Sequence, residues 1–436
     1  MAGPARDPAR RPELTRTADL VIRNAREILT CAGPAPLAGP RQRDASGIPD
    51  AALASMNGEL VFVGPTAALD TTVTLAVGAT VLDASGHSIV PGFVDAHTHA
   101  VFAGDRRGEL RRRLGGASYA EIAAAGGGIV STVEATRTSS EAELVAQSRP
   151  RLDEMLANGT TTCEIKSGYG LDVQSELRML RAIGQLRRSH AIDIVATFMG
   201  AHEVPREYRD RRERYVDLVI AEMIPAVAED GLAEWCDVFC ETGVFTPTES
   251  QRILEAGLAH GLKARIHADE LGASGGSQVA ARVGARSADH LIFAPADGIR
   301  AMAEAGVTAT LLPNAAFYLK LGRFAPARAF IDAAVPVALA TDLNPGGGFS
   351  PSMPFAITLA CFGMGMTFEE ALTAATINGA WSLDVAGRTG SLEAGKIADA
   401  VIVRGDAINL IRVGGPSIAG VLKRGRLVSG QENFST

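Results

Sequence analysis

The sequence predicts a TIM (β/α)8 barrel that carries a small β-sandwich domain formed from both ends of the chain. A strand-then-helix rhythm repeats through the middle of the 436 residues, and short β-rich stretches flank it on both sides. No GxGxxG motif follows any apolar strand, which argues against the rival doubly wound dinucleotide-binding fold. We therefore expect the barrel at 88–390 and the sandwich at 18–87 and 391–436.

The flanking stretches are short alternating runs that end at Gly or Pro, as strands do. The runs are 18–24 and 59–64 before the barrel, and 398–404 and 420–428 after it. Chain ends often lie close together in space, so the two flanks are predicted to form one domain that the barrel interrupts. Within it, the polar segment 41–51 is predicted to be a surface loop. Residues 1–17, rich in Arg, Pro and Ala, are predicted to be a flexible tail.

Eight apolar runs of strand length divide the middle of the chain. They read SIVPGFVDAH, TTTCEIK, DIVATFMGAH, CDVFCE, KARIHAD, SADHL, VTATLLPN and PVALATD. Segments with a helical pattern lie between most of them, among them 172–188, 247–260, 294–305 and 325–334. Strands without a polar face are typical of a parallel sheet that is covered on both sides, and eight such units close into a barrel.

Composition excludes several classes of protein. The chain is 47% hydrophobic and 21% charged, as globular proteins are. Its net charge is -7 and it has no long run of Lys and Arg, so no nucleic-acid partner is expected. No stretch approaches 18 apolar residues, so no membrane span is expected. The five cysteines are scattered and lack CxxC spacing, which indicates reduced thiols and a cytoplasmic protein.

Residues capable of chemistry stand at the ends of seven of the eight runs. They are His97, His99, His202, Glu241, His267, Glu270, Asp289, His290, Asn314, Asp342 and Asn344. Five of the eight histidines in the chain belong to this group. Because a TIM barrel builds its active site at the C-terminal mouth of its strands, we expect these side chains to converge there.

The His97-Thr-His99 pair suggests a metal site. Residues two apart on a strand share one face and lie roughly 6.5–7 Å apart, so two imidazoles can converge on one cation. His267 and Asp342 would complete three nitrogens and one oxygen and leave a position open for water, as catalytic zinc sites do. Taken alone, the pair is equally compatible with two hydrogen-bonded histidines of the core.

The order of these residues resembles that of the amidohydrolase superfamily of metal-dependent hydrolases. The segments DAHTHAVFAGDR, EIKSGYGLD, FMGAHEVP, HADEL, SADHL and TDLNPG resemble the imidazolonepropionase family more narrowly. The likeness runs from about residue 20 to residue 430. It implies a hydrolase of carbon–nitrogen bonds in cyclic amides, which opens 4-imidazolone-5-propanoate to N-formimidoyl-L-glutamate in histidine degradation.

The resemblance also implies roles for individual residues. One Zn²⁺ or Fe³⁺ per subunit would be held by His97, His99, His267 and Asp342. The substrate, a small molecule, would be contacted by Arg106, Tyr169, His202, Glu270, Asn344 and Gly346. The reaction itself would be served by Glu270, His290 and Asp342. A homodimer is implied as well.

The chemistry accounts for these residue types. A cyclic amide is a poor electrophile, and a bound cation lowers the pKa of water toward about 7. Glu270 or Asp342 could carry the proton of that water to the departing ring nitrogen, while His290 stabilises the developing oxyanion. The guanidinium of Arg106 could bind the substrate's carboxylate bidentately, although only the family motif favours it over Arg107.

The sequence also supports expectations for four further residues, Lys166, Glu241, Tyr169 and Gly347. Some superfamily members carbamylate a lysine to bridge two metals, but here SGYG follows Lys166, as in the single-metal family. We therefore expect Lys166 to form a salt bridge with Glu164 or Glu241, and Glu241 to support the site from outside the ligand set. Tyr169, between two glycines, is expected in a flexible loop. Gly347 stands where the family often has Thr, so one hydroxyl contact is missing.

Two other functions remain open. Another cyclic amidase, or an aminohydrolase of purines or pyrimidines, would use the same ligands with different substrate contacts, so Arg106, Tyr169 and His202 decide between them. A non-catalytic scaffold that had lost its metal would be expected to lack at least one ligand, whereas all four are present.

Overall fold

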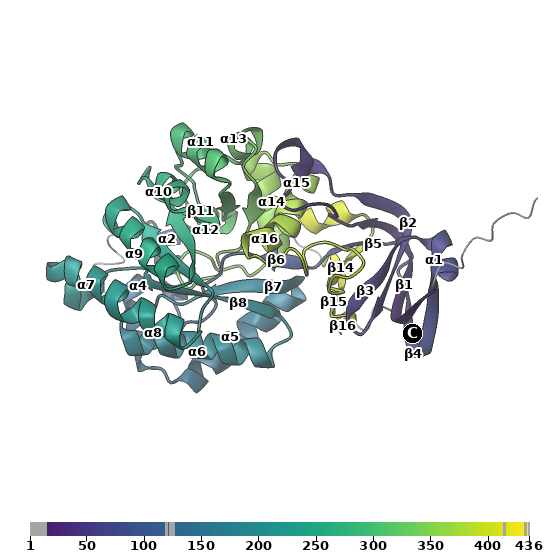
Figure 1. Ribbon diagram of the computed structural model, residues 1–436, viewed down its shortest axis with the longest axis horizontal. Helices are drawn as coiled ribbons and strands as arrows, with labels where there is room; N and C mark the ends of the chain where they lie inside the picture. The colour runs from purple at the N-terminus through teal and green to yellow at the C-terminus, as the bar shows by residue number, and fades with distance from the viewer. Residues whose placement is uncertain (1–14, 118–120, 122–126, 413–415, 431–433, 435–436) are drawn as a thin grey trace, which may run out of the picture.

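Two eight-stranded sheets organise the chain (Figure 1). The computed structural model describes residues 15–117, 121, 127–412, 416–430 and 434. One sheet is parallel throughout and uses only the middle of the chain, whereas the other joins strands from both ends.

The parallel sheet runs from β6 to β13, and each strand pairs with the next one in the chain. Its strands are β6 (Phe93–Asp95), β7 (Thr160–Lys166), β8 (Asp193–Ala201), β9 (Trp235–Cys240), β10 (Lys263–Ala268), β11 (Ser287–His290), β12 (Thr308–Leu311) and β13 (Val337–Leu339). Beyond the ends of β6 and β13, Thr98 bridges to Leu343, and the backbone N–H of His99 donates to Leu343 O at 2.8 Å. The nearly closed sheet confirms the TIM-like barrel predicted for the middle of the chain.

Helices cover the outside of this barrel (Figure 1). They are α2 (Arg107–Leu114), α4 (Ile129–Thr138), α5 (Glu141–Ala157), α6 (Val173–Ser189), η2 (Arg206–Arg211), α7 (Arg212–Leu218), η3 (Val219–Met223), α8 (Ile224–Glu229), α9 (Pro247–Ala259), α10 (Gly276–Val283), α11 (Ala296–Ala305), α12 (Pro313–Tyr318), α13 (Ala327–Asp332), α14 (Met353–Met364), α15 (Phe368–Ala374) and α16 (Ile377–Ser382). The four helices predicted between the strands are confirmed as α6, α9, α11 and α13. Capping boxes fix where α5, α9 and α15 begin, at Ser140, Thr246 and Thr367.

The second sheet brings the two ends of the chain together, as the sequence predicts. Its order is β16-β15-β14-β5-β1-β2-β3, with β4 paired to β1. The strands are β1 (Arg16–Leu29), β2 (Gly47–Met56), β3 (Glu59–Pro65), β4 (Val73–Asp83), β5 (His87–Pro91), β14 (Ala400–Arg404), β15 (Ile418–Lys423) and β16 (Arg426–Ser429); α1 (Thr66–Thr72), η1 (Gly39–Arg43) and η4 (Ala407–Ile411) lie between them. In Figure 1 the purple N-terminal strands lie beside the yellow C-terminal ones. Residues 1–14 of the predicted tail lie outside the described residues, and β1 begins at Arg16.

The first apolar run, predicted as a single barrel strand, is two strands in two sheets. β5 belongs to the terminal sheet and β6 to the barrel, and Gly92 stands between them. A Cβ atom at Gly92 would lie 2.3 Å from Oγ1 of Thr161. The chain can therefore cross from one sheet to the other here only because this residue has no side chain.

The prediction of a surface loop at 41–51 is only partly right, because six of these eleven residues are exposed but the segment contains the end of η1 and the start of β2. Gln42 is fully buried, and its Nε2 donates to Val337 O at 3.2 Å in the wall of the barrel. From Gly47 onward the segment forms β2. Polarity does not require exposure here, because backbone carbonyls of the barrel satisfy the buried amide.

Lys423 of β15 connects the two sheets. Its Nζ lies 2.9 Å from Oδ2 of Asp193 at the start of β8 and 2.6 Å from Oδ2 of Asp399. The lysine is buried, so the two carboxylates compensate its charge where the barrel meets the terminal sheet.

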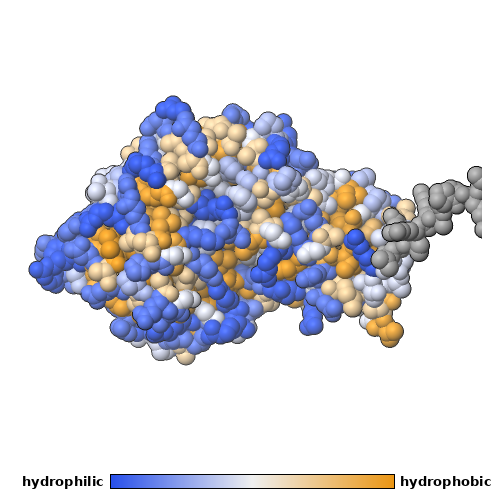
Figure 2. Space-filling model, viewed as in Figure 1, coloured by the Kyte–Doolittle hydropathy of each residue, from blue (hydrophilic) through white to orange (hydrophobic). Residues whose placement is uncertain are grey.

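The face shown in Figure 2 is mostly hydrophilic, and its hydrophobic residues form small separate groups. Among the described residues, no helix combines the length and the apolar character that crossing a bilayer requires.

Candidate metal and substrate site

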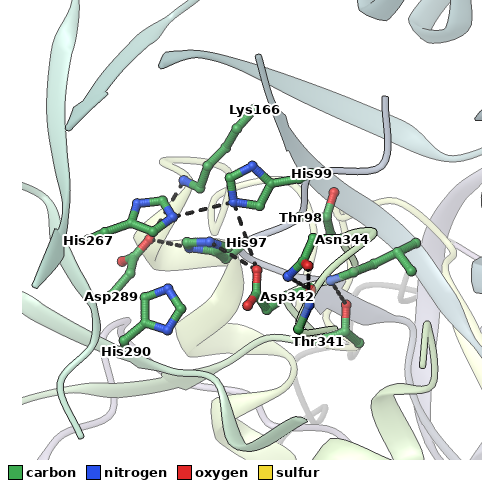
Figure 3. Close-up of polar contacts among 12 residues, drawn as sticks. His97, Thr98, His99, Lys166, His267, Asp289, His290, Thr341, Asp342 and Asn344 are labelled. Carbon is green, nitrogen blue, oxygen red and sulfur yellow. Dashed lines mark hydrogen bonds and ion pairs between the residues drawn. The ribbon is translucent and has the colours of Figure 1, made fainter. Parts of the chain in front are cut away.

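Imidazoles and one carboxylate gather at the C-terminal ends of the barrel strands. His97 and His99 follow β6, His267 lies in β10 and His290 ends β11, while Asp342 follows β13. All five side chains are buried. Figure 3 shows the rings of His97, His99 and His267 turned toward a common centre, with the carboxylate of Asp342 facing them.

The separations between these side chains fit one metal ion. Oδ1 of Asp342 lies 3.6 Å from Nε2 of His97 and 3.8 Å from Nε2 of His99. The Nε2 atoms of His99 and His267 are 3.3 Å apart. Ligand atoms of a tetrahedral site with bonds of about 2.1 Å lie about 3.4 Å from one another. His97, His99 and Asp342 are thus spaced as the ligands of a single cation are, and His267 lies beside His99.

Unpaired polar atoms within this cluster support the same reading. Among the described residues, buried atoms without a hydrogen-bond partner include Nε2 of His97, Oδ1 of Asp342 and both ring nitrogens of His290. Buried polar atoms without a partner are rare, and a cation is a partner that nitrogen and carboxylate oxygen share. Burial lowers the pKa of His97 and of His99 well below the usual range. Their rings are therefore neutral and keep the lone pairs that a metal requires.

His290 lies close enough to join a second grouping. The ring nitrogens of His97, His267 and His290 lie within 4.8 Å of one another, as do the ligand atoms of His97, His99 and Asp342. The two groupings share His97. Geometry alone therefore admits His290 beside the four ligands expected from the sequence.

Two aspartates orient His97 and His267 through the Nδ1 atoms of their rings. Oδ2 of Asp289 lies 2.7 Å from Nδ1 of His97, and Oδ1 of Asp237 lies 3.0 Å from Nδ1 of His267. Each contact fixes the ring so that Nε2 points into the cluster, as carboxylates commonly do behind metal-bound histidines. Asp289 is among the residues that the sequence places at the barrel mouth, whereas Asp237 was not predicted to belong to the site. The signal for Asp237 was a charged residue inside the largely apolar run CDVFCE.

Lys166 is an ion-pairing residue, as the sequence predicts, but its partners differ in part. Its Nζ lies 2.6 Å from Oε1 of Glu164 and 2.7 Å from Oδ2 of Asp237, and all three side chains are fully buried. Glu241, the other predicted partner, accepts the backbone N–H groups of Thr242 and Leu271, each at 2.8 Å. Glu241 therefore fixes two loops at the mouth of the barrel and does not touch the lysine.

A cavity of about 690 Å³ opens onto the cluster. Of the predicted site residues, those that line it are His99, Arg106, Tyr169, His202, His267, Glu270, His290, Asp342, Asn344 and Gly346. His97 does not line the cavity, since it lies beneath the other histidines. The structure thus brings every predicted site residue to one place.

Arg106 stands at the N-terminal end of α2 and is held in place. Its Nε and Nη2 lie 2.9 and 2.8 Å from Oε2 of Glu109. A Cβ atom at Gly346 would lie 2.4 Å from Nη1, so only glycine lets the guanidinium pack there. The amide oxygen of Asn344 accepts the N–H groups of Gly346 and Gly347, at 2.8 and 2.6 Å.

Glu270 and His290 face each other across the cavity, with Oε1 and Nδ1 3.6 Å apart. Burial, reinforced by the charges of Asp342 and Glu241, raises the pKa of Glu270 well above its usual range. Glu270 therefore holds a proton more readily than an exposed glutamate does.

Tyr169 and His202 form one wall of the cavity. Tyr169 is only 3% exposed, so its segment is not the flexible loop that the flanking glycines predicted. The ring of His202 stacks on that of His99, with centroids 4.9 Å apart. Burial, followed by the charge of His267, lowers the pKa of His202 to about 3.

The amidohydrolase family model matches residues 88–428. An imidazolonepropionase of Symbiobacterium thermophilum is 50% identical over 416 residues, which cover 95% of this chain and 98% of that protein. An imidazolonepropionase of Alkaliphilus metalliredigens is 46% identical over 413 residues, covering 94% and 98%.

Solved structures agree on the fold. A crystal structure of an adenosine deaminase from Xanthomonas campestris with bound zinc has a TM-score of 0.68 at 20% identity, covering 97% of this chain and 95% of that one. A triazine hydrolase variant has a TM-score of 0.70 at 17% identity, covering 94% of both. At these identities the likeness supports the fold alone.

Proposed function

The chain belongs to the amidohydrolase family and, within it, to the imidazolonepropionases, and from that premise we propose that it hydrolyses 4-imidazolone-5-propanoate to N-formimidoyl-L-glutamate in histidine degradation. The observation that carries the proposal is the convergence of a metal-ligand set, a guanidinium and a buried carboxyl group on one cavity. Hydrolysis of a cyclic amide that carries an anionic side chain requires a metal ion, a cation for the side chain and a group that transfers the proton.

His97, His99, His267 and Asp342 would hold one Zn²⁺ or Fe³⁺ per subunit. The spacing of His97, His99 and Asp342 supports this set, as do the unpaired Nε2 of His97 and Oδ1 of Asp342. The approach of Nε2 of His267 to Nε2 of His99 supports His267 as the fourth ligand. When bound, the cation supplies Lewis acidity and lowers the pKa of water, so that a nucleophile is available at neutral pH. Nitrogen and carboxylate ligands accommodate both metals.

Glu270 would move the proton and His290 would stabilise charge. The carboxyl group of Glu270 lines the cavity beside Asp342, where it can pass a proton to the departing ring nitrogen as the carbon–nitrogen bond breaks. Asp342 can share that proton. The imidazole of His290, 3.6 Å from Glu270, would donate a hydrogen bond to the oxygen on which negative charge develops.

Arg106 would bind the propanoate group of the substrate. Since Glu109 takes Nε and Nη2, the carboxylate would pair through the Nη1 end of the guanidinium. Tyr169 and His202 would contact the ring from the opposite wall. Asn344 and Gly346 would contact the substrate beside Arg106. The N–H groups of Gly346 and Gly347 donate to Asn344, so they do not replace the hydroxyl contact missing at Gly347.

A purine or pyrimidine aminohydrolase on the same barrel is the alternative. Its substrates are neutral, so it gives no reason for a buried guanidinium at the cavity. To test the proposal, purified protein loaded with one metal equivalent is incubated with imidazolone propanoate, with a cyclic amide that lacks a carboxylate, and with adenine. We expect loss of ultraviolet absorbance and formation of N-formimidoyl-glutamate only with the first. Turnover of adenine alone would favour the alternative.

The domain organisation is part of the proposal. We propose a sandwich-like domain from 18–87 and 391–436 around a barrel at 88–390. The pairing of β1 supports a sandwich-like domain. The first half of β1 pairs with β4 and the second half pairs with β5, so the sheet divides into two layers at this strand. β5 extends the domain boundary to Pro91.

We also propose a cytoplasmic homodimer. All five cysteines are free thiols, as a reducing compartment requires. Phe362 of α14 is 78% exposed and Phe317 of α12 is 48% exposed, and a second copy of the chain would cover this apolar face. Light scattering should give twice the chain mass for the wild type and the chain mass for Phe362→Asp; an unchanged mass in that variant would contradict the assignment of this face.

A further inference from the structure

A buried glutamate lies behind the wall of the substrate cavity and does not line it. Glu176, in the first turn of α6, is fully buried. Its Oε2 accepts the N–H of Gly168 at 3.0 Å, and its Oε1 accepts those of Gly170 and Leu171 at 2.7 and 2.8 Å. One carboxylate therefore binds three of the five backbone N–H groups of segment 167–171, which carries Tyr169.

The same segment is held from its other side by Arg137. Its Nε donates to Gly170 O at 2.6 Å, and its Nη2 donates to Leu171 O at 3.1 Å. Asp172 and Glu207 in turn pair with the guanidinium. Backbone donors and backbone acceptors of the segment are thus bound by side chains of opposite charge.

The backbone of this segment needs such support. Gly168 has φ of +105°, and Leu171 has φ of 54°, a conformation that a residue with a branched side chain seldom adopts. A Cβ atom at Gly168 would lie 2.9 Å from Nδ1 of His202 and 2.9 Å from Met199 O. Two glycines make the path possible but do not by themselves make it rigid, because glycine restricts the backbone least.

The position of the segment decides how two cavity residues are presented. Gly168 O lies 3.0 Å from Nδ1 of His202, and this contact places the proton on Nδ1 and leaves Nε2 as an acceptor. The ring of Tyr169 lies 5.2 Å from that of His202 and 5.8 Å from that of His99, centroid to centroid. A shift of segment 167–171 would displace both Tyr169 and His202.

We propose that Glu176 is a positioning residue for substrate binding, which fixes Tyr169 and the tautomer of His202 through the backbone of segment 167–171. The proposal deepens the proposed function and rests on it for the identity of the substrate. Glu176 itself does not line the cavity.

A carboxylate is required at position 176, and a side chain of the same size with a different set of hydrogen-bonding atoms does not replace it. Both oxygens accept N–H groups, so Glu176→Gln turns one acceptor into an NH₂ group that faces a backbone donor. The loss of a hydrogen bond to a charged group corresponds to a factor of about 10 to 100 in binding. We expect KM for imidazolone propanoate to rise by about that factor, while kcat changes by less than about fivefold and bound metal per chain stays the same.

The matched control is Glu249→Gln. Glu249 is also buried and also accepts a backbone N–H, that of Thr246 at 2.7 Å, but it stands at the start of α9 away from the cavity. We expect KM of this variant to equal that of the wild type. If Glu176→Gln fails to fold, Arg137→Met tests the same segment from its solvent side and should raise KM in the same way.

A double-mutant cycle distinguishes positioning from a general loss of structure. In a Tyr169→Ala/His202→Ala background, Glu176→Gln should raise KM by less than about twofold, because the groups it positions are gone. The same fold-change in both backgrounds would overturn the proposal.

Hydrogen exchange without substrate separates this inference from the proposed function. We expect the amides of 167–171 to exchange at least about tenfold faster in Glu176→Gln than in the wild type, and those of the control variant to be unchanged. Unchanged exchange in Glu176→Gln would overturn the positioning role whatever the substrate is. Faster exchange together with a wild type inert toward imidazolone propanoate would uphold it and contradict the function instead.

Discussion

Asp237 accepts two hydrogen bonds from His267, one from the ring and one from the backbone. Its Oδ1 lies 3.0 Å from Nδ1 of His267 and 3.1 Å from the backbone N. Its other oxygen lies 2.7 Å from Nζ of Lys166. Burial alone would raise the pKa of Asp237, but His267 and Lys166 hold it well below the usual range. The carboxylate is therefore ionised and fixes His267 with Nε2 toward the other ligands.

Asp237→Asn should weaken metal binding by about 10- to 100-fold, because the ring of His267 loses its charged orienting partner. The measurement is the Kd for Zn²⁺ in competition with a chelator. Glu241→Gln is the control, since Glu241 is buried at the same barrel mouth but binds only backbone N–H groups. Equal affinity in Asp237→Asn and the wild type would show that Asp237 does not support a ligand.

Lys166→Met should lower the free energy of unfolding by about 3–5 kcal/mol, because Glu164 and Asp237 would remain buried without the ammonium group that compensates their charge. Urea unfolding measures this. Lys263→Met removes an exposed pair with Asp384 and should cost under about 1 kcal/mol. Equal losses in the two variants would contradict the buried ion-pair network.

Arg106→Ala should raise KM by about 10- to 100-fold and leave the metal content unchanged, since it removes the charge that we propose to bind the substrate's carboxylate. Initial rates and metal analysis of the same preparation provide the comparison. The matched variant is Arg107→Ala, because this neighbouring guanidinium is 80% exposed. Parallel loss of metal and of substrate binding in Arg106→Ala would count against its role.

Glu370 should cause the free energy of unfolding to decrease as the pH falls into the acid range. Burial tends to raise its pKa, but hydrogen bonds from Arg328 and from the N–H of Thr367 outweigh burial and lower it below 4.5. Because the folded pKa is the lower one, the carboxylate stabilises the protein above pH 4.5, and this contribution is lost as the pH falls through the folded pKa. Glu370→Gln should therefore lower Tm at pH 7, with a loss of about 1–2 kcal/mol from the cap and ion pair. The Tm difference from the wild type should shrink below pH 4.5, and a difference that is constant from pH 7 to pH 3.5 would refute this assignment.

Much of the fold could be predicted from the sequence, because buried parallel strands are apolar throughout and each ends in a polar residue at the barrel mouth. The division of the first apolar run, SIVPGFVDAH, into β5 and β6 could not be predicted. β6 has only three residues, and nothing local distinguishes it from β5; the change of sheet depends on the contact between Gly92 and Thr161. β4 was missed although Val73, Leu75 and Val77 alternate with smaller residues, and only the structure shows its pairing with β1.

The site could be predicted to a similar degree. His97, His99, His267 and Asp342 are recognisable because metal-binding residue types recur at strand ends. Asp237 and Glu176 are not, since a carboxylate inside a strand or in the first turn of a helix is usually exposed, and only the three-dimensional contacts give these two a role.

The central claim is that four side chains hold one metal ion at the mouth of the barrel. Anomalous diffraction from crystals of the purified protein, recorded at the zinc and iron absorption edges, tests it most directly. We predict a single peak per chain, at about 2.0–2.2 Å from Nε2 of His97, His99 and His267 and from Oδ1 of Asp342. Two peaks, or one peak coordinated by His290 in place of His99 and Asp342, would contradict it.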